Sequence, residues 1–147
     1  GVGAVVGPFL AGWFAGSSEP RMRRGVLAGY IAVGVFYLLF SRAPTLALAS
    51  ACVVGAHAGA SVVWVFSTTM LQLNSEDRFR GRVFAADFSL LTLSAASSAY
   101  AVGFAMDHGV APRATAMALG AAMFLPATLW ALALRLWREE KAPPAAI

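Results

Sequence analysis

Polar side chains that could do chemistry are few in this sequence, and four of them follow a helical spacing. His57, Ser61, Trp64 and Thr68 stand at positions i, i+4, i+7 and i+11 of an otherwise apolar stretch. This spacing places all four side chains on one face of an α-helix. Because a polar side chain is costly in lipid, we expect this face to line a substrate cavity. The alternative is that His57 only hydrogen-bonds a neighbouring helix and Trp64 only fills space.

A second stretch repeats the arrangement with Asp87, Ser94 and Ser98, at i, i+7 and i+11. The two serines are candidates for the same cavity, although serines in membrane helices also bond their own backbone or let helices approach closely. Asp87 follows the charged run 76–82. An acid near a helix N-terminus is favoured by the helix dipole and can pair with nearby arginines. We therefore expect Asp87 to be an interfacial anchor or gate element rather than a proton carrier.

Other chemistries find little support in the sequence. His57 and His108 have no cysteine or acid at metal-ligand spacing, so no metal site is expected. The N-terminal run GVGAVVG lacks the third glycine of a dinucleotide-binding loop, because that position is Val6. No acid, nucleophile or metal cluster converges, and we expect neither an enzyme nor a cofactor.

The composition defines the class of protein. Hydrophobic residues make up 59% of the 147 residues and charged residues 12%, whereas a soluble domain has about 25% charged residues. A bilayer core about 30 Å thick requires about 20 apolar residues per helix. The sequence therefore predicts an all-α polytopic membrane protein in contact with the lipid bilayer. The net charge of +4 would favour a nucleic-acid partner only in a soluble protein, and no nucleic-acid partner is expected here.

Charged residues divide the chain into five predicted transmembrane helices, at residues 1–16, 25–41, 45–73, 83–106 and 114–134. Turn chemistry agrees with these divisions, because Pro20, Pro44 and Pro112 stand near segment boundaries, where a missing amide hydrogen does least harm. Pro8 and Pro126 lie inside segments and should kink them.

The glycine pairs Gly3/Gly7, Gly12/Gly16 and Gly55/Gly59 have the G-x-x-x-G spacing that suits close helix packing. The Gly55/Gly59 pair lies on the face of its helix opposite the polar stripe, so one face would pack while the other meets the cavity. The chain opens on Gly1, without a methionine and inside an apolar run, and we expect a fragment whose beginning is missing.

The eleven lysines and arginines all lie between or beside the apolar segments, with nine on one side of the membrane and two on the other if the segments cross alternately. Positively charged residues accumulate on the cytoplasmic side. We therefore expect the loops 17–24 and 74–82 and the C-terminus to be cytoplasmic in a multi-pass protein of the cell membrane.

Two connections resemble loops of a known family. The stretch from residue 68 to 93 reads TTMLQLNSEDRFRGRVFAADFSLLTL. It resembles the loop between the tenth and eleventh helices of major facilitator superfamily transporters, in the branch of enterobactin-exporter-like permeases. Gln72, Glu76 and the RGRV run, which contains Arg80, Gly81 and Arg82, carry this resemblance.

The first connection, AGWFAGSSEPRMRR, resembles the superfamily motif G-x-x-x-D-R-x-G-R-R through Gly12, Arg21, Arg23 and Arg24. Its acid is absent, because that position falls near Gly16. The resemblance implies that the residues expected to act in gating at the cytoplasmic loops are Gly12, Arg21, Arg23, Arg24, Gln72, Glu76, Arg80, Gly81, Arg82 and Asp87.

The resemblance also implies a fold and a function. The chain would be helices eight to twelve of a twelve-helix transporter, with residues 1–138 forming part of the C-terminal bundle and residues 139–147 a cytoplasmic tail. The missing N-terminal half would be its partner, and a small-molecule substrate would bind between the two bundles and cross by alternating access. We expect an exporter of a small amphipathic molecule, such as a siderophore or drug, in a bacterial inner membrane. The alternative is a non-transporting membrane scaffold, sensor or anchor module.

Overall fold

The computed structural model describes residues 2–15 and 18–140, and the regular structure of these residues is entirely helical. The helices are α1 (Val2–Ala15), α2 (Glu19–Ser41), α3 (Leu46–Asn74), α4 (Asp77–Asp107), α5 (Pro112–Ala122) and α6 (Phe124–Glu140). Four stretches are long and apolar enough to cross a membrane, namely α2, α3, α4 and Pro112–Trp137, which combines α5 with most of α6.

These four stretches confirm an all-α protein and indicate a multi-pass membrane protein. Five spans were predicted, and the described residues hold four; the first predicted span corresponds to α1, a shorter apolar helix with 14 described residues. A helix that crosses a bilayer alone needs about 20.

Proline, threonine and acidic residues set the starts of the helices. Helix α2 opens with Glu19, whose carboxylate is favoured at a helix N-terminus, and Pro20, whose ring pre-sets the backbone angle φ. Pro112 is likewise the first residue of α5. Pro44 lies just before α3, where the Thr45 hydroxyl accepts a hydrogen bond of 3.3 Å from the backbone amide three residues on. The placement of three prolines at segment boundaries is thus confirmed.

Two predicted loops are wrong in their extent. Helix α2 begins at Glu19 instead of residue 25, and α4 begins at Asp77 instead of residue 83. Residues 19–24 and 77–82 therefore form the first turns of helices, and residues 75–76 alone connect α3 to α4. The physical reason is that charge marks where a helix leaves the hydrocarbon, not where its hydrogen bonds end. Arginine is a good helix former, so the helices continue through the charged runs.

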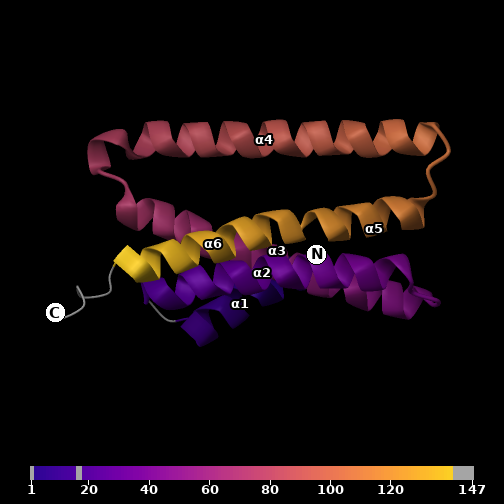
Figure 1. The fold of residues 1–147 in the computed structure, drawn as a ribbon, viewed down its shortest axis with the longest axis horizontal. Coiled ribbons are helices and arrows are strands. Elements are labelled where there is room, and N and C mark those ends of the chain that lie inside the picture. The colour runs from indigo at the N-terminus through magenta and orange to yellow at the C-terminus, as the bar shows by residue number, and fades with distance from the viewer. Residues whose placement is uncertain (1, 16–17, 141–147) are drawn as a thin grey trace.

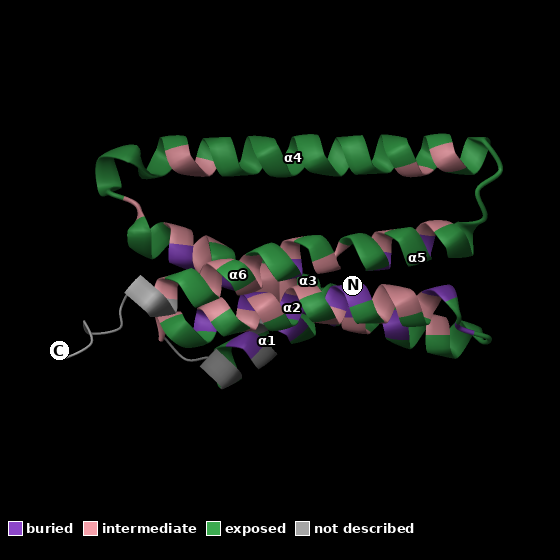
Figure 2. Cartoon of the chain, in the orientation of Figure 1, coloured by how far each residue is buried: buried purple, intermediate pink, exposed green. Residues whose placement is uncertain are grey.

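The core of the bundle lies between α2 and α3, with α1 packed on α3 and with α5 and α6 packed on α2 (Figure 1). Met22 and Val26 of α2 are buried against Phe66 and Met70 of α3. Figure 2 shows that buried residues are concentrated in these helices. Helices α2 and α3 are antiparallel neighbours joined by a short turn. Their apolar contact forms the centre of the bundle, and α1, α5 and α6 pack against these two helices.

Glycines bring the helix backbones together. A Cβ atom built on Gly59 would lie 3.0 Å from the carbonyl oxygen of Gly29, and Gly55 lies against a phenylalanine ring of α2. Gly3 and Gly7 of α1 face backbone carbonyls of α3 in the same way. The close packing predicted for Gly3/Gly7 and Gly55/Gly59 is confirmed, and the structure adds which helix each pair contacts. Nothing lies within 4 Å of a Cβ atom built on Gly12, so close packing is not observed there, and Gly16 lies outside the described residues.

The fifth predicted segment is divided at Met123, which separates α5 from α6. Pro126 explains this break, because its ring has no amide hydrogen and conflicts with the carbonyl group four residues earlier. The kink expected at Pro126 agrees with the division, whereas α1 runs through Pro8 without interruption. Helix α6 continues to Glu140, and the rest of the predicted tail 139–147 lies outside the described residues.

Helix α4 runs apart from the other helices (Figure 1) and has 31 residues, none of which is buried. It is green along almost its whole length in Figure 2, which marks exposed residues. Within the described chain it contacts α5, and near its N-terminal end its side chains line a cavity together with side chains of α3. This cavity is the candidate site.

Candidate functional site

A cavity of about 310 Å³ lies between the C-terminal half of α3 and the N-terminal half of α4. Its wall consists of Trp64, Thr68, Phe84, Ala85, Asp87 and Phe88. Three of these residues, Trp64, Thr68 and Asp87, were expected from the sequence to have functional roles on two separate helices. The structure places them around one space, and their roles stay predictions.

Helix α3 contributes an aromatic residue, Trp64, and a hydroxyl residue, Thr68, to the wall of this cavity. The Trp64 side chain is 44% exposed. The neighbours of Thr68 use their hydroxyl groups within the helix, since Ser67 Oγ and Thr69 Oγ1 each donate a hydrogen bond of 2.7 Å to a backbone carbonyl four residues earlier. No such bond involves the hydroxyl of Thr68 within the described residues, so this group is available to a ligand.

Asp87 has no ion pair or hydrogen bond within the part of the chain that the structure describes. The predicted pairing with the preceding arginines is not observed, because Arg80 pairs with Asp77 at 2.6 Å and Arg78 pairs with Glu76 at 3.0 Å. Glu76 precedes α4 directly and Asp77 lies in its first turn, so these two acids occupy the helix N-terminus, where Asp87 was expected.

The early start of α4 also changes the position of Asp87 along the helix. Asp87 lies in the third turn of α4, about 15 Å along the axis from Asp77. The helix dipole acts mainly within the first turn and does not stabilise a carboxylate at this distance. An ionisable group inside an apolar helix with no internal partner is a functional-site candidate by default.

The wall of the cavity is mainly apolar, but it includes the residue types that bind an organic cation. Asp87 has a carboxylate that can supply charge, Trp64 has an indole ring that can supply a cation–π surface, and Thr68 has a hydroxyl group that can orient a polar substituent. Phe84 and Phe88 add apolar walls. Within the described residues, no three His, Cys, Asp or Glu side chains come close enough to hold a metal ion. The arrangement therefore fits a compound with an apolar body and a positive charge.

His57 and Ser61 lie at another interface. A Cβ atom built on Gly3 of α1 would approach Cβ of His57 at 2.9 Å, and one built on Gly7 would approach Cβ of Ser61 at 2.7 Å. The polar stripe of α3 is therefore shared, with its N-terminal half against α1 and its C-terminal half facing α4. The structure does not bring His57 and Ser61 to the α3–α4 cavity, and their predicted contact with substrate stays a prediction.

Ser94 and Ser98 are exposed on the middle of α4, beyond the cavity. Two other hydroxyl residues of this helix, Ser89 and Thr92, bond to backbone carbonyls four residues earlier, at 2.7 Å and 2.8 Å. Neither Ser94 nor Ser98 has such a bond within the described residues. These two side chains are therefore free to meet a partner from outside the described chain.

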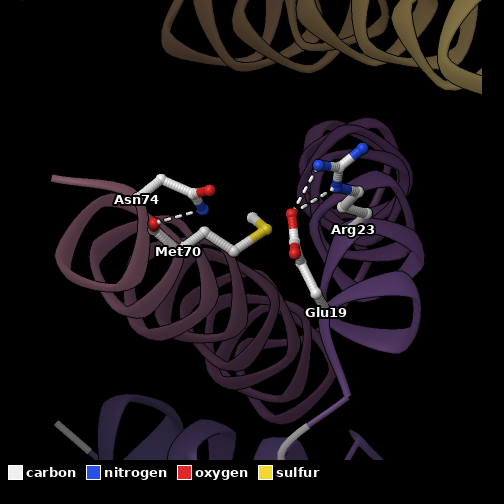
Figure 3. A network of polar contacts seen from close by, with 4 residues as sticks. All are labelled: Glu19, Arg23, Met70 and Asn74. Atoms are coloured by element: carbon white, nitrogen blue, oxygen red, sulfur yellow. Dashed lines mark hydrogen bonds and ion pairs between the residues drawn. The ribbon is translucent and has the colours of Figure 1, made fainter.

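The arginines of the first connection belong to the first two turns of α2, where Arg23 is the most constrained. Its guanidinium pairs with Glu19, which Figure 3 shows opposite the last turns of α3. The same group lies over the ring of Trp137, 4.1 Å from the centroid. The Arg23 backbone carbonyl accepts a hydrogen bond of 2.8 Å from Trp130 Nε1. Arg23 thus joins α2 to α6.

The predicted gating residues that lie outside α2 and the cavity are all exposed. They are Gly12, Gln72, Glu76, Arg80, Gly81 and Arg82. Nothing lies within 4 Å of a Cβ atom built on Gly12 or Gly81, so neither glycine is required by packing within the described residues. Gln72 stands two residues before the end of α3, near the helix end as the resemblance implied.

Several residues of these sites were missed in the sequence. Phe84 and Phe88 stand four residues apart beside Asp87, a spacing that places them on one helix face. Glu19 and its partner Arg23 are four residues apart, a spacing that predicts an ion pair on a helix. Trp130 gives no local signal, because its hydrogen-bond acceptor is 107 residues away.

The hydrogen bond from Trp130 to the Arg23 carbonyl should contribute to the stability of the fold, and a single substitution can test this. Trp130→Phe keeps a ring against Trp137 but removes the indole N–H donor to the Arg23 carbonyl. We expect the free energy of unfolding to fall by about 1 kcal/mol, the usual contribution of one hydrogen bond. Reversible unfolding in mixed micelles measures it. The matched control is Trp64→Phe, whose indole makes no hydrogen bond within the described residues; equal losses in both variants would contradict the assignment.

Comparison of this chain with protein families, with curated proteins and with solved structures gave no match.

Proposed function

We propose that this chain is part of a secondary active transporter of the major facilitator superfamily, which exports a small amphipathic compound by alternating access. The observation that carries this proposal is the α3–α4 cavity, whose wall contains Trp64, Thr68 and Asp87, an acid with no ion pair within the described residues. Transporter sites are built from polar groups on neighbouring helices at membrane depth. The acidic and aromatic residues of the cavity wall favour a substrate that is an organic cation with an apolar body.

The exposure of α4 supports the same proposal. Alternating access requires helices that change neighbours as one bundle rocks against the other. A helix with a polar stripe and no buried residue is not held in place by the described chain. Helix α4 can therefore exchange contacts between a substrate, lipid and a second bundle, whereas α2 and α3 provide the fixed part.

Efflux by the whole protein with Trp64→Ala tests the proposal. We expect the apparent affinity for ethidium, an aromatic cation, to fall about tenfold, since a central aromatic contact contributes at least about 1.4 kcal/mol. Tyr100→Ala is the control, because Tyr100 is a 75% exposed aromatic residue of α4 outside the cavity. His57→Ala tests separately whether the α1 side of the stripe meets substrate.

The expected outcome is loss of affinity in the Trp64 variant and unchanged transport in the Tyr100 variant. Wild-type transport by Trp64→Ala at normal expression would remove the cavity from the substrate path. Absence of ethidium-dependent transport from the wild-type protein under any imposed ion gradient would favour the scaffold, sensor or anchor module.

A further inference from the structure

A second and larger cavity, of about 600 Å³, lies between the N-terminal part of α2 and the C-terminal part of α6. Three arginines border it, Arg23, Arg24 and Arg135. Its volume is within the range of small-molecule sites, about 300–1,000 Å³. The cavity is distinct from the α3–α4 cavity, with which it shares no wall residue.

The charge of this cavity is positive. Glu19 is its acidic wall residue, and it is already paired with Arg23. Arg24 and Arg135 are exposed and have no acidic partner within the described residues. Within the described residues, two cationic groups of this cavity are thus without an acid. The charged residues that follow Trp137 in the sequence are two basic and two acidic, so they add no net charge.

The wall of the cavity changes from basic to apolar with depth. Leu27 follows Arg23 by one turn of α2, in the direction that leads away from the charged end. On α6, which runs the other way, Ala131 precedes Arg135 by one turn, about 6 Å along the axis. Leu134 completes this apolar part. One ligand in this space would thus meet arginines at one end and aliphatic side chains at the other.

An aromatic residue of the wall, Trp137, indicates a position near the membrane surface. Trp137 borders the cavity and stacks its ring against the Arg23 guanidinium. Tryptophan is enriched at membrane interfaces, where its ring is apolar and its N–H is polar. The arginines at this end of the bundle belong to the side that the charge distribution predicts to be cytoplasmic. The basic part of the cavity therefore lies at headgroup level and the apolar part at acyl-chain level.

We propose that this cavity binds one anionic phospholipid, with its phosphate group between Arg24 and Arg135 and the start of an acyl chain along Leu27, Ala131 and Leu134. Basic pockets between membrane helices recognise lipid headgroups through charge, and aliphatic walls add contact with the chains. A soluble phosphate compound would use only the arginines. An acidic protein segment would not reach the apolar part at membrane depth.

Lipid titration of the whole protein in dodecyl maltoside, read by native mass spectrometry, tests this site. Phosphatidylglycerol is the probe and phosphatidylcholine is the neutral reference. We expect phosphatidylglycerol to bind in preference to phosphatidylcholine. In the double variant Arg24→Gln/Arg135→Gln, its affinity should fall about thirtyfold, since each basic residue near a lipid phosphate contributes about a factor of five.

The matched control is Arg21→Gln/Arg82→Gln, which removes two exposed arginines outside the cavity and without an acidic partner in the described chain. This control should stay within about threefold of the wild type. Ala131→Phe fills the apolar part without changing charge and should also weaken phosphatidylglycerol binding. Unchanged thiol labelling of the buried Cys52 shows that each variant is folded.

Three outcomes would overturn the proposal. Equal losses in the two double variants would show general charge attraction. Equal binding of phosphatidylcholine would show that the arginines select nothing. Displacement of the lipid by an equal concentration of glycerol 3-phosphate would show a soluble phosphate site. Retained phosphatidylglycerol preference, lost only in the cavity variants, supports the lipid site, whether or not the protein transports ethidium.

Discussion

Asp87→Asn is expected to reduce gradient-driven efflux of ethidium by the whole protein about ten- to hundredfold. The carboxylate has no partner within the described residues and lies beside Trp64 and Thr68, so its charge is available to a cation. Asparagine keeps the shape of the side chain and removes the charge. A hydrogen bond to a charged group contributes about 1.5–3 kcal/mol, which corresponds to this loss in rate or affinity.

The controls for this prediction come from the same helix. Asp107→Asn removes the acid at the other end of α4, which is exposed and outside the cavity, and should leave efflux unchanged. Asp87→Glu keeps the charge and should retain most of the efflux that Asp87→Asn loses. Equal efflux by Asp87→Asn and Asp107→Asn, at equal amounts of protein in the membrane, would contradict a direct role for Asp87.

The sequence singled out three residues that line the α3–α4 cavity, Trp64, Thr68 and Asp87, but not the helices that face them. Helical spacing correctly placed Trp64 and Thr68 on one face, because side-chain direction in a helix follows from sequence position alone. Spacing cannot tell which neighbour that face meets. The structure divides the stripe between two helices, with His57 against α1 and Trp64 facing α4. The missing information is tertiary, since it depends on how helices far apart in the chain pack.

For the fold too, features that depend on one segment were predicted from the sequence, whereas features that depend on packing between helices were not. Hydropathy found the membrane stretches, because the cost of exposing polar groups to lipid is a property of each segment. The charged runs misplaced the starts of α2 and α4, since residues such as Arg21 and Arg80 are outside the hydrocarbon but remain helical. Gly55 and Gly59 were expected to pack, yet Gly25 and Gly29 have the same spacing and were missed. A glycine pair is informative only when the facing helix is known.

The contact of Gly29 with α3 predicts the largest effect on stability. A Cβ atom built on Gly29 would lie 2.6 Å from Cγ2 of Val63 and 2.8 Å from the carbonyl oxygen of Gly59. The second atom belongs to the backbone and cannot turn away. Gly29→Val should therefore force α2 and α3 apart, and an overpacked core costs about 1–3 kcal/mol. The population of the opened bundle should rise about five- to 150-fold.

Maleimide labelling of Cys52 measures this opening, because Cys52 is the one cysteine of the sequence and is 3% exposed on α3. Gly103→Val is the matched control: it places the same β-branched side chain inside α4, where nothing lies within 4 Å of the added Cβ. Both substitutions change helix propensity alike, so the difference between them isolates the α2–α3 contact. Faster labelling in the Gly29 variant alone is expected. Equal labelling rates in the two variants would mean that the glycine contact does not hold α2 against α3.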